Sequence, residues 1–306
     1  MSIKNLIPMP LRTKYRELRS LAQLPYFSLK VRALGDGGIR FMDNTETVDL
    51  IVKNGMSMAR FGDGEFGWIF QKNLVSGYQS ASPELSQRLK EVLCSDEPRL
   101  LIGILKVLSD DSNMNALAQS HWRRYKAQNM QEIISLLDSS KLYADASITR
   151  PYIDLKDRSG SFAEFENLKR IWTGRDVLLV EGDESQLGVG NDLFDRASSI
   201  RRILCPSRNA FESYDAILSA TMKYVRKGDL VLLALGPTAT VLAYDLCREG
   251  VQAVDIGHID NEYEWMRMGV KKKVPIPGKT VDELSTRGGG VAGDSRYANQ
   301  IVFRIN

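Results

Sequence analysis

Two acidic residues surrounded by glycines follow a predicted strand at residues 56–61. The stretch reads Gly62-Asp63-Gly64-Glu65. In an extended turn, residues two apart point to the same side, so we expect the carboxylates of Asp63 and Glu65 to lie together. Two hard oxygen ligands suit Mn²⁺ or Mg²⁺, which also bind substrate phosphates. The stretch therefore predicts a divalent metal site, with Arg60 and the Gly62 backbone placed to contact the phosphates.

The same glycines fit a second class of site. Gly62, Gly64 and Gly67 have the G-x-G-x-x-G spacing of dinucleotide-binding loops, so an NAD(P)-dependent oxidoreductase using residues 62–67 is an alternative. However, the acidic residue expected about 20 positions later would fall in a helix that begins at Ser82. The acidic pair also opposes direct phosphate binding, because two unit charges about 4 Å apart repel by roughly 4 kcal/mol at a dielectric constant of 20. A solvated turn is the plain alternative to both sites.

Two further stretches follow predicted strands, where parallel sheets bind their ligands. In residues 235–246, Gly236 allows a sharp turn, Pro237 suits the first helical position, and the amides from Thr238 onward form an anion site. Ordinary helix capping explains the same pattern. In residues 181–192 the glycine and asparagine positions predict a shaped loop that contacts a ribose or a base, namely Gly188, Gly190 and Asn191.

The stretch 255–265 follows the last predicted strand of the sheet and contains His258 and Asp260. A histidine at a strand end is suited to hold a metal or a diphosphate. We predict that Asp260 is the base that deprotonates an acceptor hydroxyl. Glu262 and Glu264 are close enough in sequence to take that role. The other histidine, His121, follows no strand, so we expect it to be structural.

Alternating helices and near-continuous apolar strands must position these residues. One predicted helix begins at Ser82, and another covers residues 112–138. Predicted strands lie at residues 99–105, 176–181, 203–205, 229–235 and 254–256. Such strands indicate a parallel sheet covered on both faces. The fold class expected is therefore α/β and Rossmann-like, with a mostly parallel sheet and helices on both faces.

Charge divides the chain into an arm and a body. Residues 1–40 carry eight basic and two acidic residues, a net charge of +6, whereas the whole chain carries +3, which leaves −3 for the remainder. A body of that charge without a known motif predicts no nucleic-acid partner. The arm also contains apolar residues, and three alternatives stay open: a solvated helix, packing on the body or on a second subunit, or contact with an anionic membrane surface.

The remaining composition is that of a cytoplasmic protein. No apolar run approaches the roughly 18 residues of a membrane span, no signal peptide is recognisable, and the three cysteines lack metal-type spacing, which favours buried, reduced thiols. We expect residues 41–306 to form a single catalytic domain, with a flexible loop near residues 275–295.

Five short motifs together resemble the GT-D glycosyltransferases, a bacterial family first catalogued as a domain of unknown function. They are residues 59–65 (ARFGDGE), 148–152 (ITRPY), 180–194 (VEGDESQLGVGNDLF), 235–246 (LGPTATVLAYDL) and 255–265 (DIGHIDNEYEW). The resemblance implies a Rossmann-like fold, a divalent metal at a D-x-E motif on which Asp63 and Glu65 fall, and a nucleotide-sugar donor.

The function predicted is a metal-dependent hexosyltransferase. It would move a sugar from a UDP-sugar to a glycan, glycoprotein or lipid-linked acceptor in bacterial surface-glycan assembly. A nucleotide-binding module without turnover is a further alternative. The sugar, the acceptor, the stereochemical course and the oligomeric state are left open by the sequence.

Overall fold

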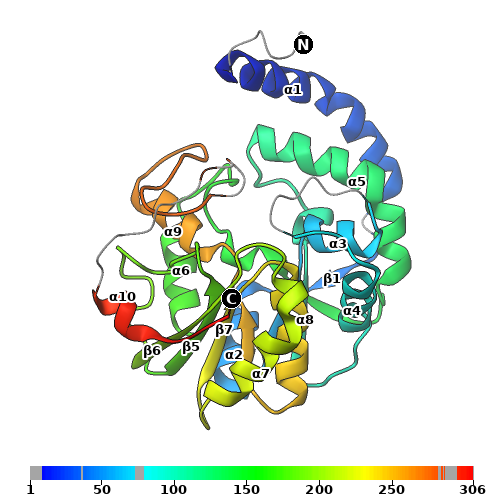
Figure 1. Cartoon of the computed structure of the whole chain (residues 1–306). Coiled ribbons are helices and arrows are strands. Elements are labelled where there is room, and N and C mark those ends of the chain that lie inside the picture. The colour runs from blue at the N-terminus through cyan, green and yellow to red at the C-terminus, as the bar shows by residue number, and fades with distance from the viewer. Residues whose placement is uncertain are drawn as a thin grey trace, which may run out of the picture.

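The chain forms a single parallel sheet with helices on both sides (Figure 1). The computed structural model describes residues 9–35, 37–72, 79–281, 284, 286 and 295–305. Within these residues the sheet has nine strands in the order β1-β4-β3-β2-β8-β7-β5-β6-β9, and every neighbouring pair is parallel. The α/β, Rossmann-like fold predicted from the sequence is confirmed.

The strands have these bounds: β1 Arg40–Phe41, β2 Ser57–Phe61, β3 Leu100–Ile104, β4 Leu142–Asp145, β5 Asp176–Gly182, β6 Ser199–Cys205, β7 Leu230–Ala234, β8 Ala253–Asp255 and β9 Ile301–Arg304. The α-helices are α1 Met9–Leu34, α2 Asn44–Asn54, α3 Asp63–Ile69, α4 Pro83–Leu93, α5 Ala116–Leu136, α6 Ser161–Lys169, α7 Tyr214–Tyr224, α8 Pro237–Arg248, α9 Ile259–Arg267 and α10 Ser295–Gln300. Short 3₁₀ helices are η2 Lys106–Leu108, η3 Ala146–Thr149 and η4 Ala210–Ser213.

The core has two layers, one on each face of the sheet, because successive side chains of a strand point to opposite faces. On β5, Leu178 and Val180 pack with residues of α3, α4, α7 and α8. Val177 and Leu179 pack on the other face with residues of α2, α6 and α9. All four side chains are fully buried, which explains why this strand reads as an uninterrupted apolar run.

Most predicted elements are present within two or three residues of their expected bounds. The helix at Ser82 begins as expected, because the Ser82 hydroxyl accepts a hydrogen bond from the Leu85 amide at 3.0 Å. β6 is longer than predicted, and β1, β4 and β9 were not predicted. Much of the expected flexible loop, residues 282, 283, 285 and 287–294, lies outside the described residues.

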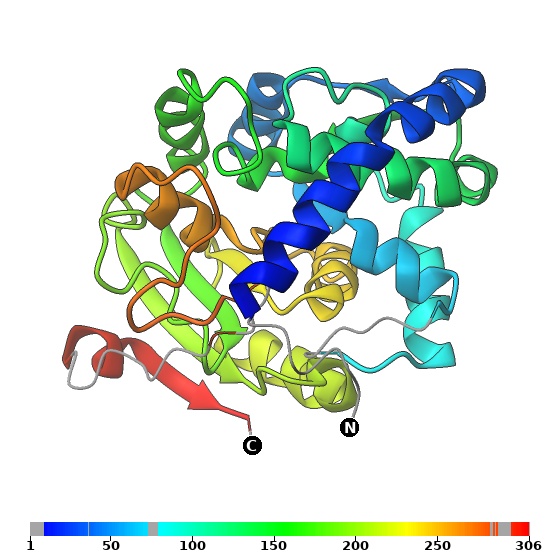
Figure 2. The same ribbon diagram turned by 90° about the horizontal axis from the view of Figure 1, so that it is seen from above.

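Residues 9–34 of the basic arm form the long helix α1, which packs along α5 (Figures 1 and 2). Seen from above, α1 crosses the top of the molecule and its N-terminal half lies over the central part of the fold (Figure 2). In the described parts of the chain, no helix is both long enough and apolar enough to cross a membrane.

Candidate active site at the carboxyl ends of the strands

The candidate site lies where β2 and β8, neighbours in the middle of the sheet, reach their carboxyl ends. α3 follows β2 directly, with Gly62 as its N-cap and Asp63 as its first residue. The predicted extended turn is therefore wrong. Residues two apart on a helix are separated by about 200°, so Asp63 and Glu65 do not point to the same side as the sequence argument required.

Glu65 turns back toward the start of its own helix. Its Oε2 accepts a hydrogen bond from the Gly62 amide at 2.8 Å, which satisfies one of the free donors of the first turn. Burial raises the pKa of the Glu65 carboxyl to about 7, and the carboxylates of Asp255 and Asp63 act in the same direction.

Asp63 instead faces the solvent beside α5. Its side chain is 50% exposed, and its Oδ2 lies 3.6 Å from Nε2 of His121, which is 57% exposed. Partial burial acts to raise the pKa of Asp63, but the hydrogen bond and charge of His121, with the charge of Arg150, outweigh it, and the pKa lies below its ordinary value. The histidine that the sequence indicated as structural therefore stands next to the predicted metal ligand.

Arg60 ties three elements together at the end of β2. Its guanidinium forms an ion pair with Asp255 of β8 at 2.8 Å and donates to the Ala146 carbonyl at 2.9 Å and the Thr149 hydroxyl at 2.7 Å in η3. The side chain is only 12% exposed. A Cβ atom at Gly257 would lie 1.9 Å from this guanidinium, so the close packing needs glycine there. Through these contacts the Arg60 side chain links β2 to β8 and η3. Its predicted contact with a phosphate stays a prediction.

The N-terminus of α8 is packed against β2. Gly236 has a φ of 54° and caps the helix, and Pro237 occupies its first turn. The hydroxyl of Thr240 donates to the Arg60 carbonyl at 2.9 Å. Thr238 is fully buried, and its hydroxyl finds no hydrogen-bond partner within the described residues. The sharp turn expected here is present, while the anion site stays a prediction.

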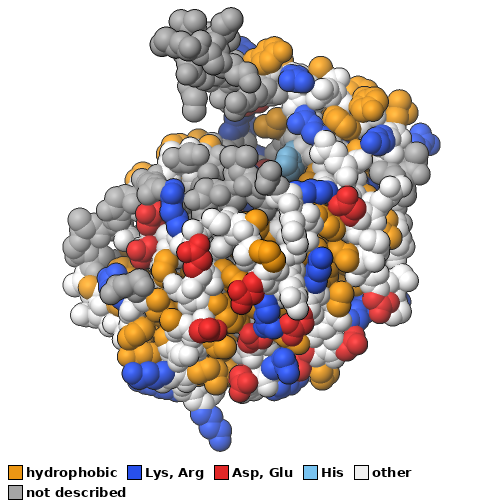
Figure 3. All heavy atoms as spheres, turned by 45° about the vertical axis from the view of Figure 1, so that its right-hand side comes forward, with side chains coloured by type: hydrophobic (Ala, Val, Ile, Leu, Met, Phe, Trp, Pro, Cys, Tyr) orange, Lys and Arg blue, Asp and Glu red, His pale blue; other side chains and the backbone are white. Residues whose placement is uncertain are grey.

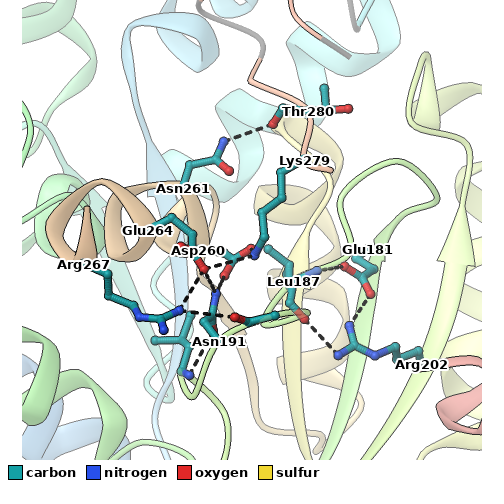
Figure 4. A network of polar contacts seen from close by, with 12 residues as sticks. Glu181, Leu187, Asn191, Arg202, Asp260, Asn261, Glu264, Arg267, Lys279 and Thr280 are labelled. Atoms are coloured by element: carbon teal, nitrogen blue, oxygen red, sulfur yellow. Dashed lines mark hydrogen bonds and ion pairs between the residues drawn. The ribbon is translucent and has the colours of Figure 1, made fainter. Parts of the chain in front are cut away.

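The loop after β5 joins a buried polar network with α9 (Figure 4). Asn191 donates to Asp260 and to Glu264, both at 2.7 Å. Lys279, from the loop after α9, forms an ion pair with Asp260, and the two side chains are 4% and 1% exposed. Arg267 donates to the Gly190 carbonyl at 3.3 Å.

The contacts of this network bear on the predicted role of Asp260 as the base, which stays a prediction. A base must come within hydrogen-bond reach of the proton that it removes, and an Asp260 carboxylate that is buried and ion-paired does not present itself to an acceptor in this arrangement. Glu262 is also buried, and it accepts a hydrogen bond from the Ile153 amide at 3.0 Å. His258 is the N-cap residue of α9 and is partly exposed.

Gly188 and Gly190 shape the loop as expected, with φ values of 71° and 81°. A Cβ at Gly188 would lie 2.5 Å from the Phe194 ring. The two glycines and Asn191 line a cavity of about 370 Å³ between this loop, β6 and α10. The predicted ribose or base contact is not tested by this geometry.

Sequence reasoning missed three residues that the structure places in or beside the site. Asp255 holds Arg60, Lys279 neutralises Asp260, and His121 lies beside Asp63. Only Asp255 had a recognisable signal, because it lies in the predicted strand 254–256 and opens the stretch 255–265. Lys279 lies in the loop after α9, and His121 lies inside α5 and not directly after a strand, so nothing in their local sequence indicates the contact.

The side chains of Asp63 and His121 are chemically suited to bind a divalent cation. Asp63 supplies an exposed carboxylate, which suits Mn²⁺ and Mg²⁺, and His121 supplies an imidazole nitrogen, which suits transition-metal ions. Among the described residues, no group of three or more His, Cys, Asp or Glu side chains is arranged as a ready metal centre. A cation here would therefore use few protein ligands and share its coordination with a substrate, as Mg²⁺ does at phosphate sites.

A family model and two relatives each match most of the chain. A family model described as "Glycosyltransferase GT-D fold" matches residues 58–284. The chain is 40% identical over 262 residues to "Probable glycosyl transferase Gly" of Streptococcus gordonii and 39% identical over 262 residues to "Glycosyltransferase GlyD" of Streptococcus pneumoniae. Each match covers 85% of this chain, but only 38% and 32% of those relatives, so the chain spans about a third of their length.

Solved structures extend the similarity to the fold. One, described as a highly conserved domain of unknown function 1792 with a distinct glycosyltransferase fold, has a TM-score of 0.83 and 39% identity, over 95% of this chain and 100% of that chain. Another, described as a new glycosyltransferase from Streptococcus sanguinis, has a TM-score of 0.82 and 39% identity, over 88% of this chain and 100% of that chain.

Proposed function

The chain belongs to the GT-D glycosyltransferase family, and we propose that it transfers a sugar from a UDP-sugar to a glycan, glycoprotein or lipid-linked acceptor with the help of Mn²⁺ or Mg²⁺. The observation that carries the metal part is the exposed carboxylate of Asp63. It opens a helix at the carboxyl end of a central strand, where parallel sheets bind their ligands, and it lies 3.6 Å from an exposed imidazole.

The chemistry required of the site is stabilisation of a departing diphosphate. A divalent cation supplies positive charge where negative charge develops on the leaving group. Asp63 is the residue proposed to hold it, with the His121 imidazole 3.6 Å away. Glu65 is proposed as a further ligand, which would turn from the Gly62 amide toward the cation. Glu65 also fixes the first turn of α3 through the Gly62 amide, and so keeps Asp63 at the start of the helix.

Other residues in this proposal position the reactants. Arg60 joins the end of β2 to β8 and η3, which fixes the position from which α3 begins. His258 is partly exposed at the start of α9 and is proposed as a contact to the metal or diphosphate. Asp260 is proposed to act through the position of α9 and the Asn191 loop, since its carboxylate is engaged by Lys279 and Asn191.

Thermal unfolding with UDP and Mn²⁺ tests the proposal. A ligand at 100 times its dissociation constant stabilises the native state by about 2.7 kcal/mol. With an unfolding entropy of about 2.1 cal/mol/K per residue, or about 0.6 kcal/mol/K for 306 residues, the melting temperature should rise by about 4 °C. UDP without metal and NAD⁺ should each give a much smaller rise.

Asp63→Asn and Glu65→Gln should remove the rise produced by UDP with Mn²⁺ and abolish hydrolysis of the UDP-sugar. Their melting temperatures without ligand should stay close to that of the native chain, because Asp63 is half exposed and glutamine still offers an oxygen to the Gly62 amide. Asp215→Asn and Glu212→Gln, both exposed near α7, are the matched controls. A full response to UDP and Mn²⁺ in both site variants, or a response to NAD⁺ alone, contradicts the proposal.

A further inference from the structure

The outward face of α1 carries large apolar side chains that no part of the described structure covers. Tyr15, Leu18, Tyr26 and Leu29 are 66%, 59%, 64% and 72% exposed. At about 100° per residue they fall within an arc of about 80°, so they form one stripe along the helix. Figure 3 shows hydrophobic and basic side chains together at the upper right, over α1.

Basic residues flank this stripe on both sides. Lys14 and Arg32 lie on one flank, and Arg19 and Lys30 lie on the other, when residues are placed at about 100° intervals. All four side chains are exposed. Among the described side chains of α1, the one acidic residue is Glu17, which is turned toward Lys272 at 3.7 Å. The outward face is therefore apolar in the middle and cationic at both edges.

The opposite face of α1 already holds the helix in place. The Ser20 and Ser120 hydroxyls share a hydrogen bond of 2.7 Å, Arg123 donates to the Ser28 hydroxyl at 2.7 Å, and the Arg124 guanidinium lies 5.6 Å from the centre of the Phe27 ring. The contacts to α5 are thus largely polar. The stripe residues remain mostly exposed beside this packing, so their apolar surface is available to a partner outside the described structure.

We propose that the outward face of α1, defined by the stripe and its four flanking basic residues, docks on an anionic lipid surface. An apolar stripe between cationic edges is the arrangement of helices that lie in a membrane interface, where each basic residue also gains from the negative surface potential. A second copy of the chain fits the face less well, because it would bring two sets of four cations together without an anionic partner on either.

Docking in this way would place the candidate site next to the lipid. Ser120, which contacts α1, is adjacent to His121, and His121 lies 3.6 Å from Asp63. α1 also reaches the loop after α9 through the ion pair of Glu17 with Lys272. An acceptor held at the membrane surface is the consequence, and that part rests on the proposed glycosyltransferase function.

Co-sedimentation of the full chain with vesicles tests the surface directly. Binding is expected with vesicles containing 30% phosphatidylserine at low salt, with a steep loss at high salt, and none with neutral phosphatidylcholine vesicles. Leu18→Gln, Tyr26→Gln and Leu29→Gln combined should lower the partition coefficient at least about 10-fold. Arg19→Gln and Lys30→Gln should each lower it about five-fold.

Matched controls separate this face from general stickiness. Phe162→Gln on α6, 64% exposed, and the charge variants Lys90→Gln and Lys227→Gln, exposed elsewhere, should bind like the native chain. No vesicle binding by the native chain, or equal losses in the controls, overturns the proposal. The proposal is also overturned if light scattering shows that the native chain is a dimer and the triple variant is a monomer, because the face is then an interface between copies.

UDP-sugar hydrolysis in solution is measured on the same samples. The triple variant should keep the native rate, because its side chains point away from the site. A native chain that binds vesicles but shows no hydrolysis supports the docking surface and contradicts the proposed function, so the two proposals can fail separately.

Discussion

Replacing Lys279 with methionine removes the cation from a buried ion pair and leaves the methylene packing almost unchanged. Lys279 and its partner Asp260 are 4% and 1% exposed. After the change, the Asp260 carboxylate keeps only the amide of Asn191 as a partner among the described contacts. The low exposure means that water cannot take the place of the ammonium group.

Breaking a buried pair from one side costs about 3–5 kcal/mol. With an unfolding entropy of about 0.6 kcal/mol/K for a chain of 306 residues, the melting temperature of Lys279→Met should fall by about 5–8 °C. Adding Asp260→Asn should recover most of this loss, because the unpaired charge disappears. Lys271→Met, exposed in the same loop, should change the melting temperature by less than about 1 °C.

Differential scanning calorimetry of the four variants, including Asp260→Asn alone, measures these shifts. UDP-sugar hydrolysis by the folded proteins then separates two roles for Asp260. A residue that positions α9 loses stability and turnover together, and the double variant regains both. If Lys279→Met melts within about 1 °C of the native chain, or if the double variant is no more stable than Lys279→Met, the ion pair does not hold this loop as we argue.

Three further substitutions test the contacts around the site. Gly257→Ala should be destabilised by at least about 2 kcal/mol more than Gly250→Ala, as measured by urea unfolding. Both glycines have a positive φ, but only a Cβ at residue 257 would meet Arg60. Arg60→Lys keeps the positive charge but loses the branched hydrogen bonds of the guanidinium, so it should lower the free energy of unfolding by at least about 2 kcal/mol. An unchanged free energy of unfolding together with weaker UDP binding would instead favour a phosphate contact. Thr238→Val removes a buried hydroxyl without a described partner, so it should be neutral or stabilising by up to about 1 kcal/mol; a loss of UDP affinity in calorimetric titration would show that the hydroxyl serves the ligand.

The central strands were predictable because they are buried on both faces. β5 and β7 read as continuous apolar runs, and their side chains are almost all buried. The strands that escaped prediction lie at or near the edges. β1 has two residues, β4 has an exposed first residue, and β9 has two exposed residues of four. Such strands lack the apolar run that marks a central strand.

The site was predictable as a set of strand ends, but its pairings were not. Asp63 and the α8 turn were found because each follows an apolar strand. Their partners depend on the order of strands in the sheet and on helix α5. Arg60 meets Asp255 because β2 and β8 are neighbours, and Asp63 meets His121 because α5 passes beside the first residue of α3. Which side a carboxylate takes depends on where a helix begins, and α3 begins at Asp63 where an extended turn was predicted, so Glu65 turns back to the Gly62 amide.

The pairing of charges at this edge bears on how the proposed diphosphate group of the donor would be bound there. Three cationic side chains near the site are already engaged, because Arg60 pairs with Asp255, Lys279 with Asp260 and Arg202 with Glu181. An incoming diphosphate would meet Asp63 at the start of α3. Each close pair of like charges costs roughly 4 kcal/mol at a dielectric constant of 20, which exceeds what the first turn of a helix returns, at about 0.3–1 kcal/mol. A cation between the Asp63 carboxylate and the phosphate would turn this repulsion into two attractions. This arrangement of charges is the physical reason for placing the proposed metal at Asp63.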